Sequence, residues 1–199
     1  VDNAIRFNNT YVQGLKEKIT LITGINNPNS VAQLKNWIGE RTGQEVKSLN
    51  KESIKGLLEA CGDAVVKEVI KLRALTAKSS VSKYEAMERS VCRDGRVRGV
   101  AQFYGANRTG RWAGRIIQPQ NLPQNHMADL ALARETLVSG DYGLFEMLYG
   151  DVSHVLSELI RTAIIPSEGR RFIVSDFSAI EARVVAYLAG ERWRLEVFR

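Results

Sequence analysis

The spacing of apolar residues changes twice along this chain of 199 residues, and that pattern limits the fold more than any other feature. From residue 1 to about residue 92, apolar residues recur at helical intervals. Residues 96–105 alternate partly and are rich in Val, Phe and Tyr, which favours a β-strand. Residues 127–165 return to helical spacing, and residues 170–177 read as a strand that leads into a helix at 178–190. Helices followed by strand-rich segments predict an α+β fold.

Caps and breakers set the expected ends of these helices. Gly24 is expected to end the first helix, and Ser30 or Asn29 to cap the second, which Gly39 or Gly43 closes. Residues 63–87 predict one longer helix, and residues 111–124 predict a loop with a short extended piece. Breaks in the later helical stretch are expected at Gly140, Gly143, Gly150 and Pro166.

Composition narrows the classes of function. No apolar run reaches the roughly 18–20 residues that span a bilayer, so no membrane partner is expected. Cys61 and Cys92 have no metal-type spacing and are expected to be free thiols. With only two histidines, His126 and His154, a zinc site built on histidine is not expected.

The basic residues are concentrated in two places. The net charge is +6 and the pI about 9.4, which fits a polyanionic partner. Residues 93–115 carry six arginines against one acid, Asp94, with Tyr104 and Trp112 as stacking surface. This segment predicts contact with nucleic acid; the alternative is an arginine-rich turn paired with acids elsewhere. Three lysines would share one face of the 63–87 helix, either along a phosphate backbone or simply in solvent: Lys67, Lys71 and Lys78.

Asp176 follows the apolar run of the expected strand, and two interpretations of it remain open. In the first, Ser178 and Glu181 form a capping box, and Asp176 favours the positive helix N-terminus. In the second, a carboxylate at the end of a rigid strand binds Mg²⁺ together with a second carboxylate. Local physics favours the first.

Several stretches resemble family-A DNA polymerases, the group of bacterial DNA polymerase I and related phage enzymes. "SDFSAIEARVVAYLAG" resembles their motif A, "TGRWAGRIIQPQNLPQ" their T-G-R block, and "DGRVRGVAQFYG" the strand before that block. "NSVAQLKNWI" and "VVKEVIKLRALTAKSSVSKY" resemble thumb helices. The resemblance implies a helical thumb (1–92) joined to part of an antiparallel palm sheet (93–199). Residues 124–155 are longer than the family norm, as if a helical element were inserted.

The resemblance also implies roles for single residues. Asp176 would be the first of two aspartates that bind two Mg²⁺ ions, with the backbone carbonyl of Phe177 as a further ligand. The incoming nucleotide would meet Ser178, Ile180 and Glu181, and Glu181 would exclude a ribose 2′-OH. Arg111 would reach the minor groove, Gln118, Gln120 and Asn121 would line the duplex, and Arg73 and Lys78 would touch its backbone. Phe177 and Ala179 depart from the usual Tyr and Gln.

The implied activity is template-directed DNA synthesis from dNTPs on a primer–template, in the cytoplasm of a bacterial or phage-infected cell. The sequence ends at Arg199, before the family's fingers helix and second catalytic aspartate, so we expect these residues to need the remainder of a polymerase chain. One alternative is a non-catalytic duplex DNA-binding module. A second is a single-subunit RNA polymerase, against which Glu181 argues because its carboxylate would crowd the 2′-OH.

Overall fold

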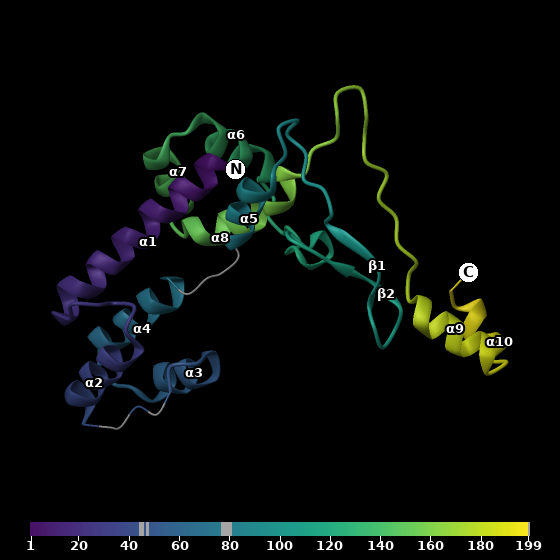
Figure 1. Cartoon of the computed structure of the whole chain (residues 1–199). Helices are drawn as coiled ribbons and strands as arrows, with labels where there is room; N and C mark the ends of the chain where they lie inside the picture. Colours follow the sequence, from purple (N-terminus) through teal and green to yellow (C-terminus); the bar gives the residue numbers. More distant parts are fainter. Residues whose placement is uncertain (44–45, 47, 77–80, 199) are drawn as a thin grey trace. The chain divides into compact units, whose positions relative to one another are not determined.

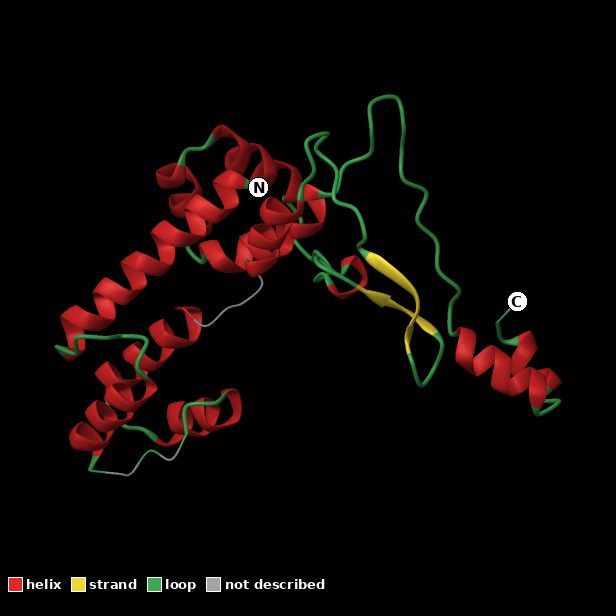
Figure 2. Cartoon of the chain, viewed as in Figure 1, coloured by secondary structure: helices red, strands yellow, loops and turns green. Residues whose placement is uncertain are grey.

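A computed structural model of the chain describes residues 1–43, 46, 48–76 and 81–198. This part is mostly helical with one antiparallel pair of strands, which confirms an α+β fold (Figure 1 and Figure 2). The chain divides into two compact units, Val1–Ile164 and Ile165–Arg199. In chain order the elements are α1 (Asp2–Thr23), α2 (Val31–Thr42), α3 (Lys51–Ala60), α4 (Ala64–Thr76), α5 (Ser82–Ser90), β1 (Ala101–Ala106), β2 (Arg111–Gly114), the 3₁₀ turn η1 (Pro119–Asn121), α6 (Leu130–Ser139), α7 (Tyr142–Tyr149), α8 (Val152–Leu159), the 3₁₀ turn η2 (Ile160–Ala163), α9 (Ile180–Leu188) and α10 (Arg192–Glu196).

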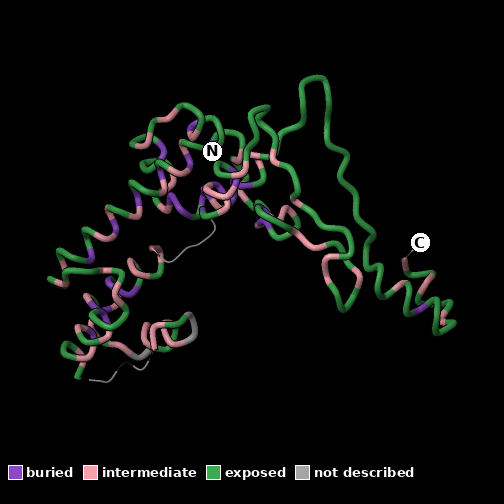
Figure 3. The backbone as a smooth tube through the Cα atoms, viewed as in Figure 1, coloured by how far each residue is buried: buried purple, intermediate pink, exposed green. Residues whose placement is uncertain are grey.

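Helix α1 forms because its apolar residues follow the 3.6-residue period. Gly24 ends it in the left-handed conformation (φ 71°), and its N–H donates to the carbonyl oxygen of Thr20, as the sequence predicted. The apolar residues Ile5, Val12 and Ile22 lie at the edge of the buried face and are only half-buried. The buried positions, which Figure 3 shows recurring along this helix, are Ala4, Phe7, Tyr11, Leu15 and Ile19.

Helices α2 to α4 pack with the end of α1 around a second, smaller core. The predicted cap of α2 is confirmed: the Ser30 side chain accepts a hydrogen bond from the Gln33 N–H, and Gly43 ends the helix. Asp63 begins α4, since its carboxylate accepts from the backbone N–H groups of Val65 and Val66. The fully buried apolar residues of this region are Ile19, Leu34, Ile38, Val46, Val66, Val69 and Ile70.

The larger core joins the start of α1 to elements far along the chain. The Phe7 ring packs edge-on against Tyr142 and Phe145, with centroids 5.4 and 5.3 Å away. The Ser153 hydroxyl donates to the Asn8 side-chain oxygen at 3.1 Å. Helices α1, α5, α6, α7 and α8 therefore share one core.

Two predictions about helix ends are wrong. The helix predicted over 63–87 is divided into α4, which ends at Thr76, and α5, which begins at Ser82. At the end of α4 the Thr76 hydroxyl donates to the Arg73 carbonyl and accepts from the Arg73 guanidinium. Gly143 does not break a helix but lies inside α7. The stops at Gly140 and Gly150 are confirmed, because both adopt positive φ and because the Asp141 and Asp151 side chains cap the helices that follow.

The second unit is described by itself. The strand predicted over 170–177 is wrong, because residues 171–177 form exposed irregular backbone with no pairing strand in the described part of the chain. Ile173 and Val174 are 85% and 91% exposed. Helices α9 and α10 pack together around Ala186. Across the described ranges, no helix combines the length and apolar character that crossing a membrane requires.

Candidate nucleic-acid interface

The arginine-rich segment folds into a hairpin of β1 and β2. Ala101 pairs with Gly114, Gln102 with Ala113, and Ala106 with Arg111, and a bulge lies between Gln102 and Ala106. The Gly110 N–H donates to the Ala106 carbonyl at 2.8 Å and closes the turn. The strand predicted over 96–105 begins only at Ala101, and residues 111–114 were predicted as loop, because four residues are too short to show alternation.

Three aromatic side chains stay exposed on this hairpin. Phe103 and Trp112, on opposite strands, have ring centroids 5.3 Å apart, and Tyr104 lies 6.4 Å from Phe103. Trp112 is 64% exposed and Phe103 72%. Exposed aromatic clusters of this kind often lie at interaction sites, which makes this face of the hairpin a candidate binding surface.

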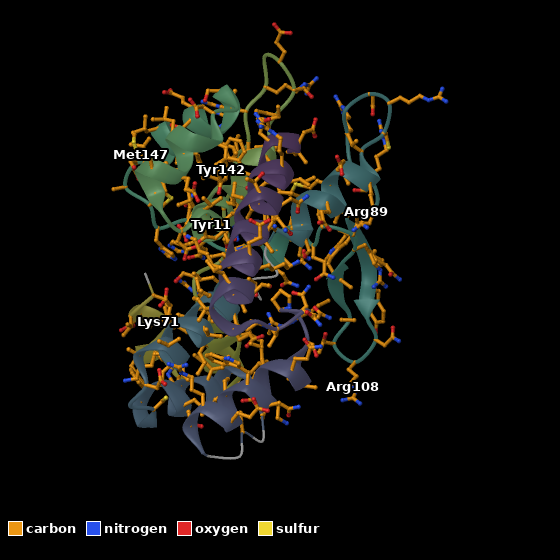
Figure 4. All side chains as sticks on the ribbon, turned by 90° about the vertical axis from the view of Figure 1, so that its left-hand side faces the viewer. Tyr11, Lys71, Arg89, Arg108, Tyr142 and Met147 are labelled. Carbon is orange, nitrogen blue, oxygen red and sulfur yellow. The ribbon has the colours of Figure 1, made fainter. Side chains whose placement is uncertain are left out.

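The arginines around the hairpin differ in their surroundings. Arg98 forms a two-armed ion pair with Asp94, which holds the pKa of that carboxyl far below its usual range. Arg115 donates from Nε to the Gln102 side-chain oxygen at 2.7 Å. Arg108 is exposed in the turn, and Figure 4 shows its side chain at the tip of the hairpin. The alternative role, an arginine that pairs with an acid in a turn, therefore applies to Arg98, whereas Arg108 faces solvent.

The loop after β2 has a fixed, unusual backbone. Ile116 and Gln118 both adopt positive φ (58° and 49°), which non-glycine residues rarely do. Between them Ile117 is buried in the main core, and Leu122 is buried beyond η1. The side-chain amide of Asn121 donates to the Gln118 side-chain oxygen at 2.9 Å. Two apolar anchors thus hold a loop whose amide side chains lie at the surface.

Gln120 lies directly over strand β2. A Cβ built on Gly114 would come within 2.0 Å of the Gln120 Nε2 atom, so this amide occupies the space that any other residue at 114 would fill. The turn η1 packs against β2. The structure thereby gathers four sequence-predicted site residues on one hairpin and its following loop, here called the hairpin–loop module (residues 101–122): Arg111, Gln118, Gln120 and Asn121.

Two side chains from α8 and the 3₁₀ turn η2 hold this loop through its backbone. Arg161 donates from Nε to the Pro123 carbonyl and from Nη2 to the Leu122 carbonyl, both at 2.7 Å. The buried carboxylate of Glu158 accepts from the His126 N–H. Neither residue was predicted from the sequence. An available signal was the single acid within the apolar run "VLSELI", since a buried carboxylate needs a partner.

The predicted thumb contacts are only partly described. Arg73 lies in the last turn of α4, half-buried, and its Nη1 donates to the Thr76 hydroxyl at 2.9 Å. This contact holds its guanidinium against its own helix. Lys71 is exposed on α4 (Figure 4), and Lys67 is half-buried there. Lys78 falls outside the described residues.

Asp176 lies in the exposed segment before α9. Its Oδ1 accepts from the Phe177 N–H at 2.9 Å. Phe177, Ser178, Ile180 and Glu181 are exposed as well. Arg183, one turn into α9, donates from Nε to the Ser178 carbonyl oxygen at 2.7 Å and lies 4.6 Å from the Phe198 ring centroid. The segment that leads into α9 is therefore tied to the helix by Arg183.

The predicted capping box is wrong. The N-cap of α9 is Ala179, in the left-handed conformation (φ 51°, ψ 42°), and no side-chain hydrogen bond caps this helix. A capping residue normally has extended backbone, which lets its side chain turn back to the first free N–H groups. Ser178 precedes that position by one residue, and its carbonyl oxygen is used by Arg183 instead.

The donor set around Asp176 suits Mg²⁺ in kind but not in number. A carboxylate and a backbone carbonyl are oxygen ligands of the type Mg²⁺ prefers. Within the described ranges, however, no group of three or more His, Cys, Asp or Glu side chains could hold a metal ion. The described residues around Asp176 therefore do not form a complete magnesium site by themselves.

The chain is 57% identical over 198 residues to a DNA polymerase of Bacillus phage SP02. The match covers 100% of this chain and 30% of that polymerase, so the chain spans less than a third of its relative's length. No protein-family model and no solved structure matches the chain. The similarity supports the resemblance to a DNA polymerase that the motifs indicated.

Proposed function

We propose that this chain is part of the polymerising region of a family-A DNA polymerase, with primer–template DNA and dNTPs as substrates. Two features of the sequence support the proposal. The similarity to a phage DNA polymerase extends over the whole chain. The motif-A-like and T-G-R-like stretches occur in the order that family-A enzymes have. The proposed place of action is the cytoplasm of a bacterial or phage-infected cell, and the remainder of the polymerase chain is a required partner.

One observation carries the proposal: four donor side chains, Arg111, Gln118, Gln120 and Asn121, lie on the hairpin–loop module. In the minor groove every base pair presents the same acceptors, N3 of purines and O2 of pyrimidines. Amide NH₂ and guanidinium groups can donate to these acceptors whatever the sequence. A polymerase must hold every sequence it copies, so a sequence-independent donor surface is what the primer terminus needs.

The Asp176 segment would supply the chemistry. In the complete enzyme Asp176 would hold one of the ligand positions for two Mg²⁺ ions, with the Phe177 carbonyl beside it. When bound, these ions would lower the pKa of the primer hydroxyl and neutralise charge on the phosphates. Ser178 and Ile180 would contact the incoming nucleotide, and the Glu181 carboxylate would occupy the space of a ribose 2′-OH. Helix α9 and Arg183 would keep this segment in place.

The reaction would be nucleotidyl transfer. The primer 3′-oxygen forms a bond to the α-phosphorus of the dNTP, the bond from that phosphorus to the bridging oxygen of the β-phosphate breaks, and pyrophosphate leaves. The hydroxyl proton passes to water. Because the described residues bring no group of three ligands together, the 199 residues by themselves are expected not to extend a primer.

The test is Asp176→Ala in the longer polymerase that contains this sequence. Primer extension should be lost, while affinity for primer–template DNA should stay within about twofold, since the carboxylate would meet the metal and not the duplex. Glu168→Ala, another exposed acid of the second unit, is the matched control and should extend normally. If Asp176→Ala extends primers at the normal rate, the catalytic assignment is wrong.

The same experiment addresses a second candidate, a non-catalytic duplex-binding module. One observation favours this candidate. All four donor side chains belong to the first compact unit, whereas Asp176 belongs to the second. On this reading, neither the parent protein nor any variant extends a primer, yet DNA binding persists and weakens with salt. Glu181→Ala gives a further check, since ribonucleotide incorporation should rise if this carboxylate excludes the 2′-OH.

A further inference from the structure

The chain segments that enter and leave helices α6 to α8 are joined by hydrogen bonds next to the hairpin–loop module. The chain leaves the module through residues 122–126, passes through α6, α7 and α8, and returns at Glu158 and Arg161. The three hydrogen bonds that join these segments reach Leu122, Pro123 and His126. The acceptors and the donor on the loop side are all backbone groups, so the contact fixes the path of the chain itself.

Glu158 and Arg161 follow backbone that is anchored in the main core. Glu158 belongs to α8, four of whose side chains are fully or almost fully buried in the main core: Val152, Val155, Leu156 and Leu159. Arg161 follows in η2, directly after the buried Ile160. On the loop side, Leu122 enters the same core, whereas Gln120 and Asn121 are exposed. The well-packed helix α8 therefore presents the Glu158 carboxylate to a surface loop, and the adjoining turn η2 presents the Arg161 guanidinium.

We infer that Arg161 and Glu158 are positioning residues for duplex binding, an inference that rests on the proposed function. They would act through the backbone at 122–126 and so set where the Gln120 and Asn121 amides meet the minor groove. Guanidinium suits this role because its planar fork reaches two carbonyl oxygens one residue apart. Helices α6 to α8 then support the loop through these hydrogen bonds. Disrupting the bonds should weaken DNA binding even if none of these helices touches DNA.

The test measures the affinity of the chain for a fluorescently labelled primer–template duplex by anisotropy, over a range of salt concentrations. Arg161→Ala removes two hydrogen bonds and should weaken binding by about tenfold. The slope of log affinity against log salt should stay as in the parent, because a positioning residue meets no phosphate. A direct phosphate contact would instead lower that slope by about one, and this result overturns the inference.

A double-mutant cycle provides the second readout. If Arg161 acts through the loop, Arg161→Ala and Asn121→Ala together should weaken binding little more than the larger single effect. Additive losses would show that the two side chains act separately, which contradicts the inference. Arg134→Ala removes the same charge from exposed α6 and is the matched control, with parent affinity expected.

Glu158 keeps the inference testable if Arg161→Ala fails to fold. Glu158→Gln retains a side-chain oxygen that can accept from the His126 N–H, so affinity should stay near the parent's, whereas Glu158→Ala should lose several-fold. Equal affinity of Glu158→Ala and the parent, with both folded by circular dichroism, overturns the inference. If the parent chain itself binds no duplex, the proposed function fails first and the inference fails with it.

Discussion

The hydroxyl of Tyr84 donates a 2.8 Å hydrogen bond to the backbone carbonyl of Leu156, 72 residues further along the chain. Tyr84 belongs to α5 and Leu156 to α8, and both side chains are fully buried. Burial raises the pKa of Tyr84 well above its usual range, because the charged form would lose its solvent. This hydrogen bond between uncharged groups therefore joins α5, which precedes the hairpin–loop module, to α8, which follows it.

Tyr84→Phe should destabilise the chain by about 1–2 kcal/mol, because the Leu156 carbonyl is left buried without its donor. The free energy of unfolding is measured by urea denaturation followed by far-UV circular dichroism. Tyr187→Phe makes the same change on an exposed tyrosine and should have almost no effect. If both substitutions lower the free energy of unfolding equally, the hydrogen bond from Tyr84 to Leu156 does not contribute to stability.

Asp63 should make the α2–α4 region sensitive to acid. Its backbone hydrogen bond from Val66, together with the 2.6 Å contact to Arg41 Nε, lowers the pKa of this carboxyl. A lowered folded-state pKa contributes stability above the unfolded value of about 4, and this stability is lost as the pH falls through the folded value. Asp63→Asn should therefore lower the melting temperature at neutral pH and reduce the fall in melting temperature as the pH drops below the unfolded-state value of about 4.

The matched control for Asp63 is Glu40→Gln, which removes an exposed acid next to Arg41 in sequence. It should leave the acid transition as steep as in the parent. If Asp63→Asn melts with the parent's pH dependence, the carboxylate is not the source of the acid sensitivity.

Gly105 and Ala113 should be replaceable only as a pair. A Cβ at position 105 would lie 2.4 Å from the Ala113 Cβ, and neither backbone can yield cheaply within the bulged hairpin. Gly105→Ala should speed hydrogen exchange of the β1 and β2 amides, measured by mass spectrometry. Adding Ala113→Gly removes the opposing methyl group and should restore slow exchange, whereas failure of this rescue would place the clash elsewhere.

Gly114→Ala should affect DNA binding more than stability. The atom that the new methyl group meets is the far end of Gln120, a flexible side chain that can swing away. The melting temperature should hardly change, while duplex affinity should fall about as much as it does for Gln120→Ala. The double substitution should add nothing further, because both changes remove the same amide. Additive losses would mean that Gln120 does not depend on Gly114.

Local signals in the sequence predicted helix ends well, since caps act through neighbouring atoms. Gly24 and Gly43 end helices because glycine readily adopts the left-handed backbone, and Ser30 begins a helix because its hydroxyl accepts a free N–H. Long-range pairing was harder to predict. "RFIV" has the composition of a strand but has no partner strand in the described part, whereas "RWAG" lacks the pattern and forms β2 because β1 lies beside it.

The residues of the candidate site also fall into those that the sequence could predict and those that depend on long-range packing. Arg111, Gln118, Gln120 and Asn121 were expected from the motif resemblance, and the structure gathers them on one module. Glu158 and Arg161 could not be expected from motifs, because their partners are backbone groups whose position depends on tertiary packing. The Ser178 cap failed because nothing in the sequence signals the left-handed backbone at Ala179.

The closure of the main core across the chain also has a consequence for folding during synthesis. The Asn3 side-chain amide donates to the Leu137 carbonyl, 134 residues later, and Phe7 needs Tyr142 and Phe145 to be covered. At a translation rate of 5–20 residues per second, α1 waits on the order of ten seconds for these partners. During that interval its apolar face is open to chaperones, and slow translation of the first 140 residues should increase its exposure to them.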